Sequence, residues 1–201
     1  SFNRNADNAI LTNGNLVTVY EEEDVPNYSI EAKISDTNGN PIATISVDST
    51  NGARDPQVTS LANGNFVATW EETGDIRYRV FNSVGAAVTG RMTAITGANN
   101  QNEPDIVALP DGGFVIVWDD DTADTVLARA YLATGATDGA VITVGGSGTG
   151  IDVGVTGDGR ILFAWDDQAG NIDASIWDPR DSSAIDSADY AAVPINFVNA
   201  D

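Results

Sequence analysis

Residues 110–121 read PDGGFVIVWDDD, and this stretch decides the fold. Its Asp-Gly pair before a run of β-forming residues is a strong short-range signal of a β-hairpin, because type I′ turns need positive φ angles. The run FVIVW is apolar at successive positions and does not alternate with polar residues. Both faces of this strand must therefore be buried, as in a sheet that lies between two others.

The stretch occurs four times along the chain. Residues 12–23 read TNGNLVTVYEEE, residues 62–73 read ANGNFVATWEET, and residues 157–168 read GDGRILFAWDDQ. The chain is therefore built from four divergent copies of one unit, with a repeat of about 48 residues. The aligned glycines are Gly14, Gly64, Gly112 and Gly159.

Each unit extends into four expected strands, and sustained helical periodicity is missing. Units of about 40–50 residues with four strands each are typical of β-propellers. We expect an all-β fold, a four-bladed β-propeller built of four-stranded antiparallel blades, which forms a single domain over residues 1–201. The blades cover approximately residues 1–53, 54–102, 103–149 and 150–201. Three alternatives stay open: a two-sheet sandwich, a larger ring to which the four units belong, and an association of two copies.

The charge of the chain excludes several classes of partner. It carries 30 acidic and 9 basic residues, for a net charge of -21. Nucleic acids and anionic membranes require basic patches, so neither is expected to bind. No apolar run reaches the length of about 18 residues that predicts membrane insertion. Cations, neutral glycans and basic protein surfaces are the expected partners.

The composition also bears on where the protein works. It is acidic, rich in Asn, Asp, Gly and Thr, poor in Lys and free of Cys. These features are typical of bacterial extracellular proteins, so we expect an extracellular or cell-surface location. The chain opens at Ser1 without Met, which predicts a processed protein or a piece of a longer one.

The second and third units share the pattern P-x-V-x-x-L-x-N/D-G-x-F-V-x-x-W, followed by acidic residues. This pattern resembles repeats in large secreted proteobacterial proteins of the calcium-binding, type I-exported class. The resemblance implies a secreted or surface location and a role in adhesion, matrix or glycan contact, and it implies no particular reaction. It rests on Pro56, Val58, Leu61, Asn63, Gly64, Phe66, Val67, Trp70, Pro104, Ile106, Leu109, Asp111, Gly112, Phe114, Val115 and Trp118.

Two groups of oxygen-bearing side chains are candidate sites for a hard cation such as Ca²⁺. One is a ring around the channel mouth, at a fixed offset before each aligned glycine, and the other is the acidic loop after the third repeated strand. The ring residues could instead cap strand starts or bind backbone amides, and the acidic loops could form a solvated rim. The ring contains Asp7, Gln57, Asp105 and Asp152, and the loop contains Asp119, Asp120 and Asp121.

Basic and aromatic residues recur with the same period. Lys33, Arg79 and Arg129 could pair with the acids that end the repeated strand. The aromatic residues at the end of that strand are expected in the core between blades. Trp177 is the more exposed candidate for sugar stacking, with Tyr131 and Phe81 at equivalent positions. The aromatic set of the repeated strand is Tyr20, Trp70, Trp118 and Trp165.

These features favour a non-enzymatic extracellular binding or assembly module, which contacts a glycan or a protein, or self-associates, and is stabilised by calcium. The chain has no His and no Cys, so the commonest general base and the thiol nucleophile are both missing. The alternative is a polysaccharide-active enzyme, a carboxylate-based hydrolase or lyase, because two carboxyl groups suffice for glycoside hydrolysis.

Overall fold

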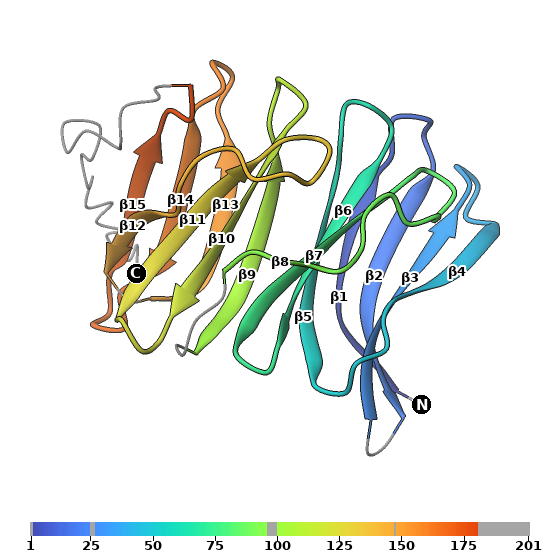
Figure 1. Cartoon of the computed structure of the whole chain (residues 1–201), viewed down its shortest axis with the longest axis horizontal. Coiled ribbons are helices and arrows are strands. Elements are labelled where there is room, and N and C mark those ends of the chain that lie inside the picture. The colour runs from blue at the N-terminus through green and yellow to red at the C-terminus, as the bar shows by residue number, and fades with distance from the viewer. Residues whose placement is uncertain (1, 25–26, 96–99, 147, 181–201) are drawn as a thin grey trace, which may run out of the picture.

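The computed structural model describes residues 2–24, 27–95, 100–146 and 148–180. Within these ranges every regular element is a β-strand, and the strands form four antiparallel sheets, numbered here blades 1 to 4 in chain order (Figure 1). Blade 1 contains β1 (Phe2–Ile10), β2 (Leu16–Asp24), β3 (Asn27–Ser35) and β4 (Pro41–Asp48). Blade 2 contains β5 (Ala53–Ser60), β6 (Phe66–Glu72), β7 (Asp75–Phe81) and β8 (Met92–Thr93).

The second half of the chain repeats this order. Blade 3 contains β9 (Gln101–Ala108), β10 (Phe114–Asp120), β11 (Thr125–Tyr131) and β12 (Ile142–Gly146). Blade 4 contains β13 (Thr149–Val155), β14 (Ile161–Asp166) and β15 (Ile172–Trp177). The predicted all-β fold with one antiparallel sheet per sequence unit is confirmed. Residues 181–201 of the expected fourth blade lie outside the described residues.

The hairpins between the first two strands of each blade form where the sequence predicts them. Gly14, Gly64, Gly112 and Gly159 all have positive φ angles, between 85° and 97°. The preceding Asn or Asp stabilises the turn from its side chain: Asp111 Oδ1, for example, accepts a hydrogen bond of 3.0 Å from Gly113 N. The Asn/Asp-Gly pairs are therefore selected by turn geometry.

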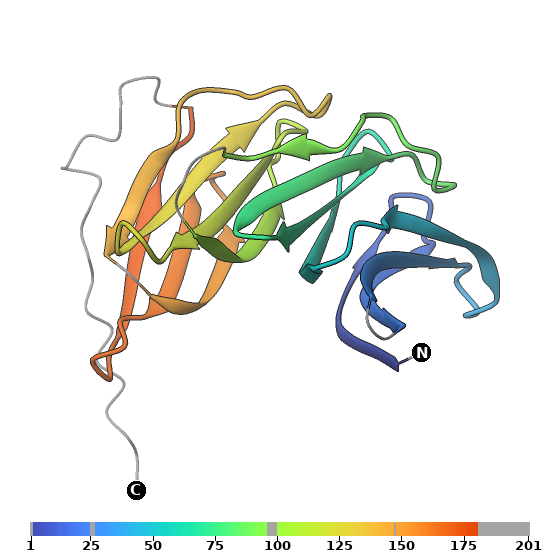
Figure 2. The same ribbon diagram turned by 60° about the horizontal axis from the view of Figure 1, so that its bottom comes forward.

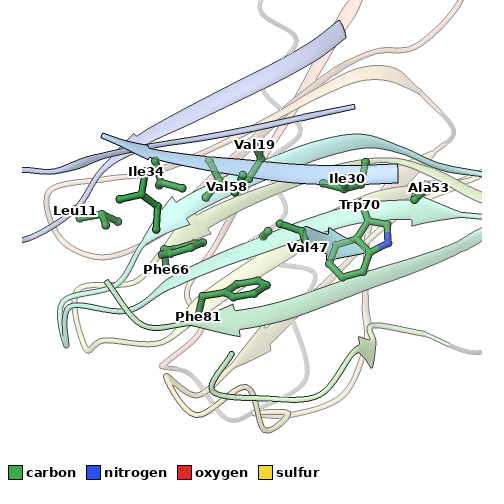
Figure 3. Packing of buried hydrophobic residues seen from close by; sticks show 13 residues of the cluster. Leu11, Val19, Ile30, Ile34, Val47, Ala53, Val58, Phe66, Trp70 and Phe81 are labelled. Atoms are coloured by element: carbon green, nitrogen blue, oxygen red, sulfur yellow. The ribbon is translucent and has the colours of Figure 1, made fainter. Parts of the chain in front are cut away.

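Each blade has two different faces. The aromatic face carries Tyr20, Trp70, Trp118 or Trp165, and the opposite valine face carries Val17, Val67, Val115 or Leu162. The valine face of blade 1 packs on the aromatic face of blade 2: one apolar cluster joins Val19 and Ile30 to Phe66, Trp70 and Phe81 (Figure 3). Similar clusters join blade 2 to blade 3 and blade 3 to blade 4.

This stacking explains the burial of the repeated strand. All seven residues of β6 and of β10 are buried, because each of these strands lies between two neighbouring blades. In β14 burial alternates, and Leu162 is 39% exposed, because no described blade covers the valine face of blade 4. The prediction of a doubly buried strand is thus confirmed for the two central blades and wrong for the last one.

The blades form an open arc. The inner strands pack in the order β1, β5, β9 and β13, and blades 1 and 4 lie at opposite ends of the molecule (Figures 1 and 2). The described residues therefore show four blades arranged as in a propeller, without closure of a four-bladed ring.

Trp70, Trp118 and Trp165 lie in the core between blades, as predicted, whereas Tyr20 lies on the aromatic face of blade 1 and belongs to none of the clusters between blades. Tyr20 is 6% exposed, Trp165 is 4% exposed, and Trp70 and Trp118 are fully buried. The expectation of exposure at Tyr131 and Phe81 is wrong. Both are buried, since each ring stacks on a phenylalanine of the adjacent strand of its own blade, with centroids about 5 Å apart. Trp177 is half-buried.

Candidate functional site

The four predicted ring residues occupy one register position on the inner strands. Asp7 pairs with Val19, Gln57 with Thr69, Asp105 with Val117, and Asp152 with Ala164. A β-bulge precedes or flanks this position in every blade. Three of the bulges contain a residue other than glycine with positive φ, and these residues are Asn5, Asp55 and Glu103.

Two ring carboxylates connect successive blades. Asp7 Oδ2 accepts a hydrogen bond of 2.8 Å from Val58 N of blade 2. Asp105 Oδ2 accepts one of 2.9 Å from Val153 N of blade 4, while its Oδ1 accepts one of 2.7 Å from Ile106 N. These contacts match the alternative that such side chains bind backbone amides, and they hold two of the carboxylates between successive inner strands.

Asp105 has an unusual proton affinity. Its pKa is raised to about 6, mainly by burial and in smaller part by the negative charges of Asp152 and Asp7, against the opposing effect of its two backbone N–H donors. Asp105 is half-buried, whereas Asp152 is exposed to solvent. The site therefore places a carboxyl group that holds its proton up to about pH 6 beside two other carboxyl groups.

The three acids of the predicted loop do not converge. Asp120 is buried, and its Oδ1 accepts hydrogen bonds from Thr122 N and Ala123 N, so it closes the turn after β10. Asp119 is buried on the valine face and accepts a hydrogen bond from Gly148 N of 3.3 Å. Burial, with Asp121 beside it, raises the pKa of Asp119 well above its ordinary value.

Asp121 is exposed, and its carboxylate accepts hydrogen bonds from the side-chain amides of Asn100 and Asn102, at 2.8 and 2.7 Å. Among the residues that the structure describes, no three acidic, His or Cys side chains lie together as a preformed metal site.

The basic residues of the repeat take partners other than the acids that end the repeated strand. The Lys33 amine lies over the Tyr20 ring, and the Arg79 and Arg129 guanidinium groups donate to backbone oxygens of Thr89 and Gly139. The buried acids pair instead with arginines of the inner strand, which sequence reasoning missed. Those pairs are Arg4–Glu21 and Arg54–Glu71. The sequence does carry a signal for these pairs, because Arg4 and Arg54 both lie three residues before the ring position of their unit.

Two surface cavities lie away from the inner-strand carboxylates. One of about 190 Å³ lies between the hairpins of blades 3 and 4 and is lined by Asp111, Asp158 and Arg180 among others. The other, of about 300 Å³, lies between blades 1 and 2 beside Asp48 and Arg91. Arg91 already pairs with Asp48 and Glu72, so this second cavity is a polar crevice with its charges compensated.

No family model and no curated protein matches the chain, but the fold resembles solved structures of glycan-cleaving enzymes. An exo-β-1,3-galactanase from Phanerochaete chrysosporium, with β-1,3-galactotriose bound, has a TM-score of 0.61 at 8% identity, over 86% of this chain and 46% of that one. An α-L-arabinofuranosidase from Podospora anserina, in complex with cellotriose, has a TM-score of 0.55 at 11% identity, over 87% and 63%.

An exo-β-1,3-galactanase from Clostridium thermocellum has a TM-score of 0.58 at 9% identity, over 84% of this chain and 44% of that one. The chain therefore spans only part of each of these proteins. At such low identity the likeness establishes the fold, a β-propeller-like arrangement of antiparallel sheets. No helix in the described residues is long and apolar enough to span a membrane.

The comparison corrects the expected function. A non-enzymatic binding or assembly module was expected, and this expectation is wrong, because the structures that share the fold are glycoside hydrolases. The missing His and Cys supported that expectation, yet glycoside hydrolysis requires only two carboxyl groups. The findings favour the alternative, a polysaccharide-active enzyme.

Proposed function

We propose that the chain contributes four blades to a propeller that hydrolyses glycans, with the inner-strand carboxylates around Asp105 as its active site. The observation that carries this proposal is the raised pKa of Asp105, to about 6, beside the carboxyl groups of Asp7 and Asp152. Carboxyl pairs with different proton affinities mark the acid and the base or nucleophile of a hydrolase.

The two roles follow from the surroundings of each group. Asp105 is half-buried and holds its proton up to about pH 6, so it is the proton donor to the leaving-group oxygen. Asp152 is solvent-exposed on the next inner strand and acts as the second carboxylate, which attacks the sugar or activates a water. The bond from Val153 N to Asp105 orients the donor, since the amide lies on the strand that also carries Asp152.

The charge of the chain limits the substrate. A net charge of -21 repels negatively charged polyuronates, whereas neutral glycans bind without electrostatic repulsion. β-Linked galactans and arabinofuranose-bearing glycans are therefore the substrates to test first, in line with the names of the matched enzymes. Such polymers lie outside the cell, which agrees with the acidic composition and with the resemblance of the repeat to secreted proteins.

The test is hydrolysis by the whole chain of β-1,3-galactooligosaccharides and of arabinofuranosylated oligosaccharides, with product sugars quantified by chromatography. We expect Asp105→Asn to lower the hydrolysis rate at least about a hundredfold, the usual contribution of a general acid. Asp111→Asn is the matched control, because the equivalent hairpin positions in blades 1 and 2 already carry Asn13 and Asn63. Equal rates in Asp105→Asn and wild type would refute the proposed site.

A further inference from the structure

Blades 1 and 2 neutralise a buried carboxylate in the same way. Glu21 and Glu71 end the repeated strand, and they are 3% and 1% exposed. Arg4 lies directly opposite Glu21 in the strand register, and Arg54 lies directly opposite Glu71. The Arg54 guanidinium donates to Glu71 at 2.5 Å, and that of Arg4 lies 3.9 Å from Glu21. Burying a carboxylate without a partner of opposite charge costs folding free energy, so the arginine is needed wherever the unit buries this acid.

Blade 3 keeps the buried carboxylate and lacks the arginine. Asp119 takes the place of Glu21 and Glu71, is 1% exposed, and lies opposite Asn102. Its Oδ1 has one long hydrogen bond, of 3.3 Å from Gly148 N. Among the described residues, no donor bonds its buried Oδ2. The side chain that faces it at hydrogen-bonding range is another acid, Asp121. Asp119 is therefore a buried acid with one oxygen left unsatisfied.

A second carboxylate beside Asp119 also follows the pattern of blade 1. There, Arg4 bonds Glu23 as well as lying close to Glu21, so one guanidinium serves two acids two residues apart. Blade 3 has Asp119 and Asp121 at the same two positions, and these side chains are near neighbours. Among the residues that the structure describes, the donors to Asp121 are neutral amides, those of Asn100 and Asn102. The two acids thus lack the positive charge that their counterparts in blade 1 possess.

We propose that blade 3 binds a calcium ion between Asp119 and Asp121, in the place that the Arg4 guanidinium takes in blade 1. The aspartates of blade 3 are one methylene shorter than the glutamates of blade 1. The Asn102 side-chain oxygen is a third ligand after rotation of its amide, and water fills the remaining positions, as calcium accepts six to eight oxygens. Asp120 takes no part, because it closes the turn.

The site lies at the contact of blades 3 and 4. Asp119 bonds Gly148 N, and Glu103, in the bulge next to Asn102, bonds Gly150 N at 2.6 Å. An ion that fixes Asp119 therefore also fixes the start of the last inner strand. This effect is on stability, so it is independent of whether the chain hydrolyses glycans.

The experiment is calorimetric titration of the chelator-treated whole chain with CaCl₂, and separately with MgCl₂, together with thermal unfolding in both salts. We expect one saturable calcium site and a calcium-dependent rise in Tm that magnesium does not reproduce at the same concentration. Asn102→Arg, which restores the residue type of blades 1 and 2, should abolish calcium binding and keep Tm in chelator at or above that of the wild type.

Asp121→Asn is the second variant, because its exposed side chain can change without loss of folding. It should weaken calcium binding at least about tenfold. Asp111→Asn, on the hairpin at the other end of the blade, should bind as the wild type does. Absence of saturable calcium binding, or unchanged affinity in both Asn102→Arg and Asp121→Asn, would overturn the proposal.

Discussion

At the scale of the residue, the pKa of Asp105 is set by its neighbours in the fold. Its register position follows from the repeat, and sequence reasoning selected it as an oxygen donor facing the channel. The repeat does not predict its hydrogen bond from Val153 N, because Val153 lies 48 residues further along the chain. The two residues become neighbours only when blades 3 and 4 pack together. The same holds for Asp7 and Val58, which are 51 residues apart. Sequence therefore predicts the place of such a residue but not its proton affinity.

The raised pKa of Asp105 makes stability depend on pH. Its folded-state pKa of about 6 lies above the ordinary value of 3.8, so the folded protein binds more protons between these pH values. The contribution of Asp105 to the free energy of unfolding should therefore fall as pH rises from about 4 to 6, by an amount on the order of 2 kcal/mol after allowance for partial exposure.

The measurement is urea unfolding of wild type and Asp105→Asn at several pH values from 4 to 7. Many other carboxylates titrate in this range, so the difference between the two proteins is the quantity of interest. That difference should shift in favour of the variant as pH rises. A difference that stays constant with pH would contradict the assignment, and Asp111→Asn gives the baseline for loss of an exposed acid.

At the scale of the element, the inner bulges and the repeated strands differ in how well the sequence predicts them. The repeated strand and its hairpin carry clear signals in the Asn/Asp-Gly pair and the apolar run that follows. The bulges carry a weaker one. Asn5 and Asp55 belong to residue types that tolerate positive φ, but Glu103 does not, and nothing in its sequence context marks the bulge. Bulge geometry could therefore not be predicted for blade 3.

The position of a blade in the arc should decide what a valine-face substitution costs. Val115 is fully buried between blades 3 and 4, whereas Leu162, at the equivalent position of blade 4, is 39% exposed. Val115→Ala should lower the free energy of unfolding by about 2 kcal/mol, because it leaves a cavity in a packed seam. Leu162→Ala should cost less than about 1 kcal/mol, although it removes more atoms.

Chemical denaturation of the two variants beside wild type measures both costs. Equal costs, or a larger cost for Leu162→Ala, would show that the valine face of blade 4 is covered, in contradiction to the exposure seen here.

At the scale of the whole molecule, the two end blades explain why the arc stays open. The aromatic face of blade 1 carries Thr18 and Glu31 where blade 3 carries the apolar residues Ile116 and Leu127. Packing this polar face on the apolar Leu162 of blade 4 would remove the Glu31 carboxylate, whose donor is the Tyr20 hydroxyl, from water, which is unfavourable for a charged group. The repeat correctly predicts one sheet per sequence unit. Whether the ring closes depends on whether the outer faces of blades 1 and 4 are both apolar, and the repeat period alone does not predict this.

The pH–rate profile of glycan hydrolysis tests the central claim most directly, namely that Asp105 is the proton donor of a carboxylate active site. If Asp105 must hold its proton to act, kcat/KM should fall as pH rises above about 6, the pKa that burial and its acidic neighbours give this group. Asp105→Asn should lose this alkaline limb together with most of the rate, while Asp111→Asn keeps both. A rate that stays flat from pH 5 to 8, or an alkaline limb that persists unchanged in Asp105→Asn, would contradict the account.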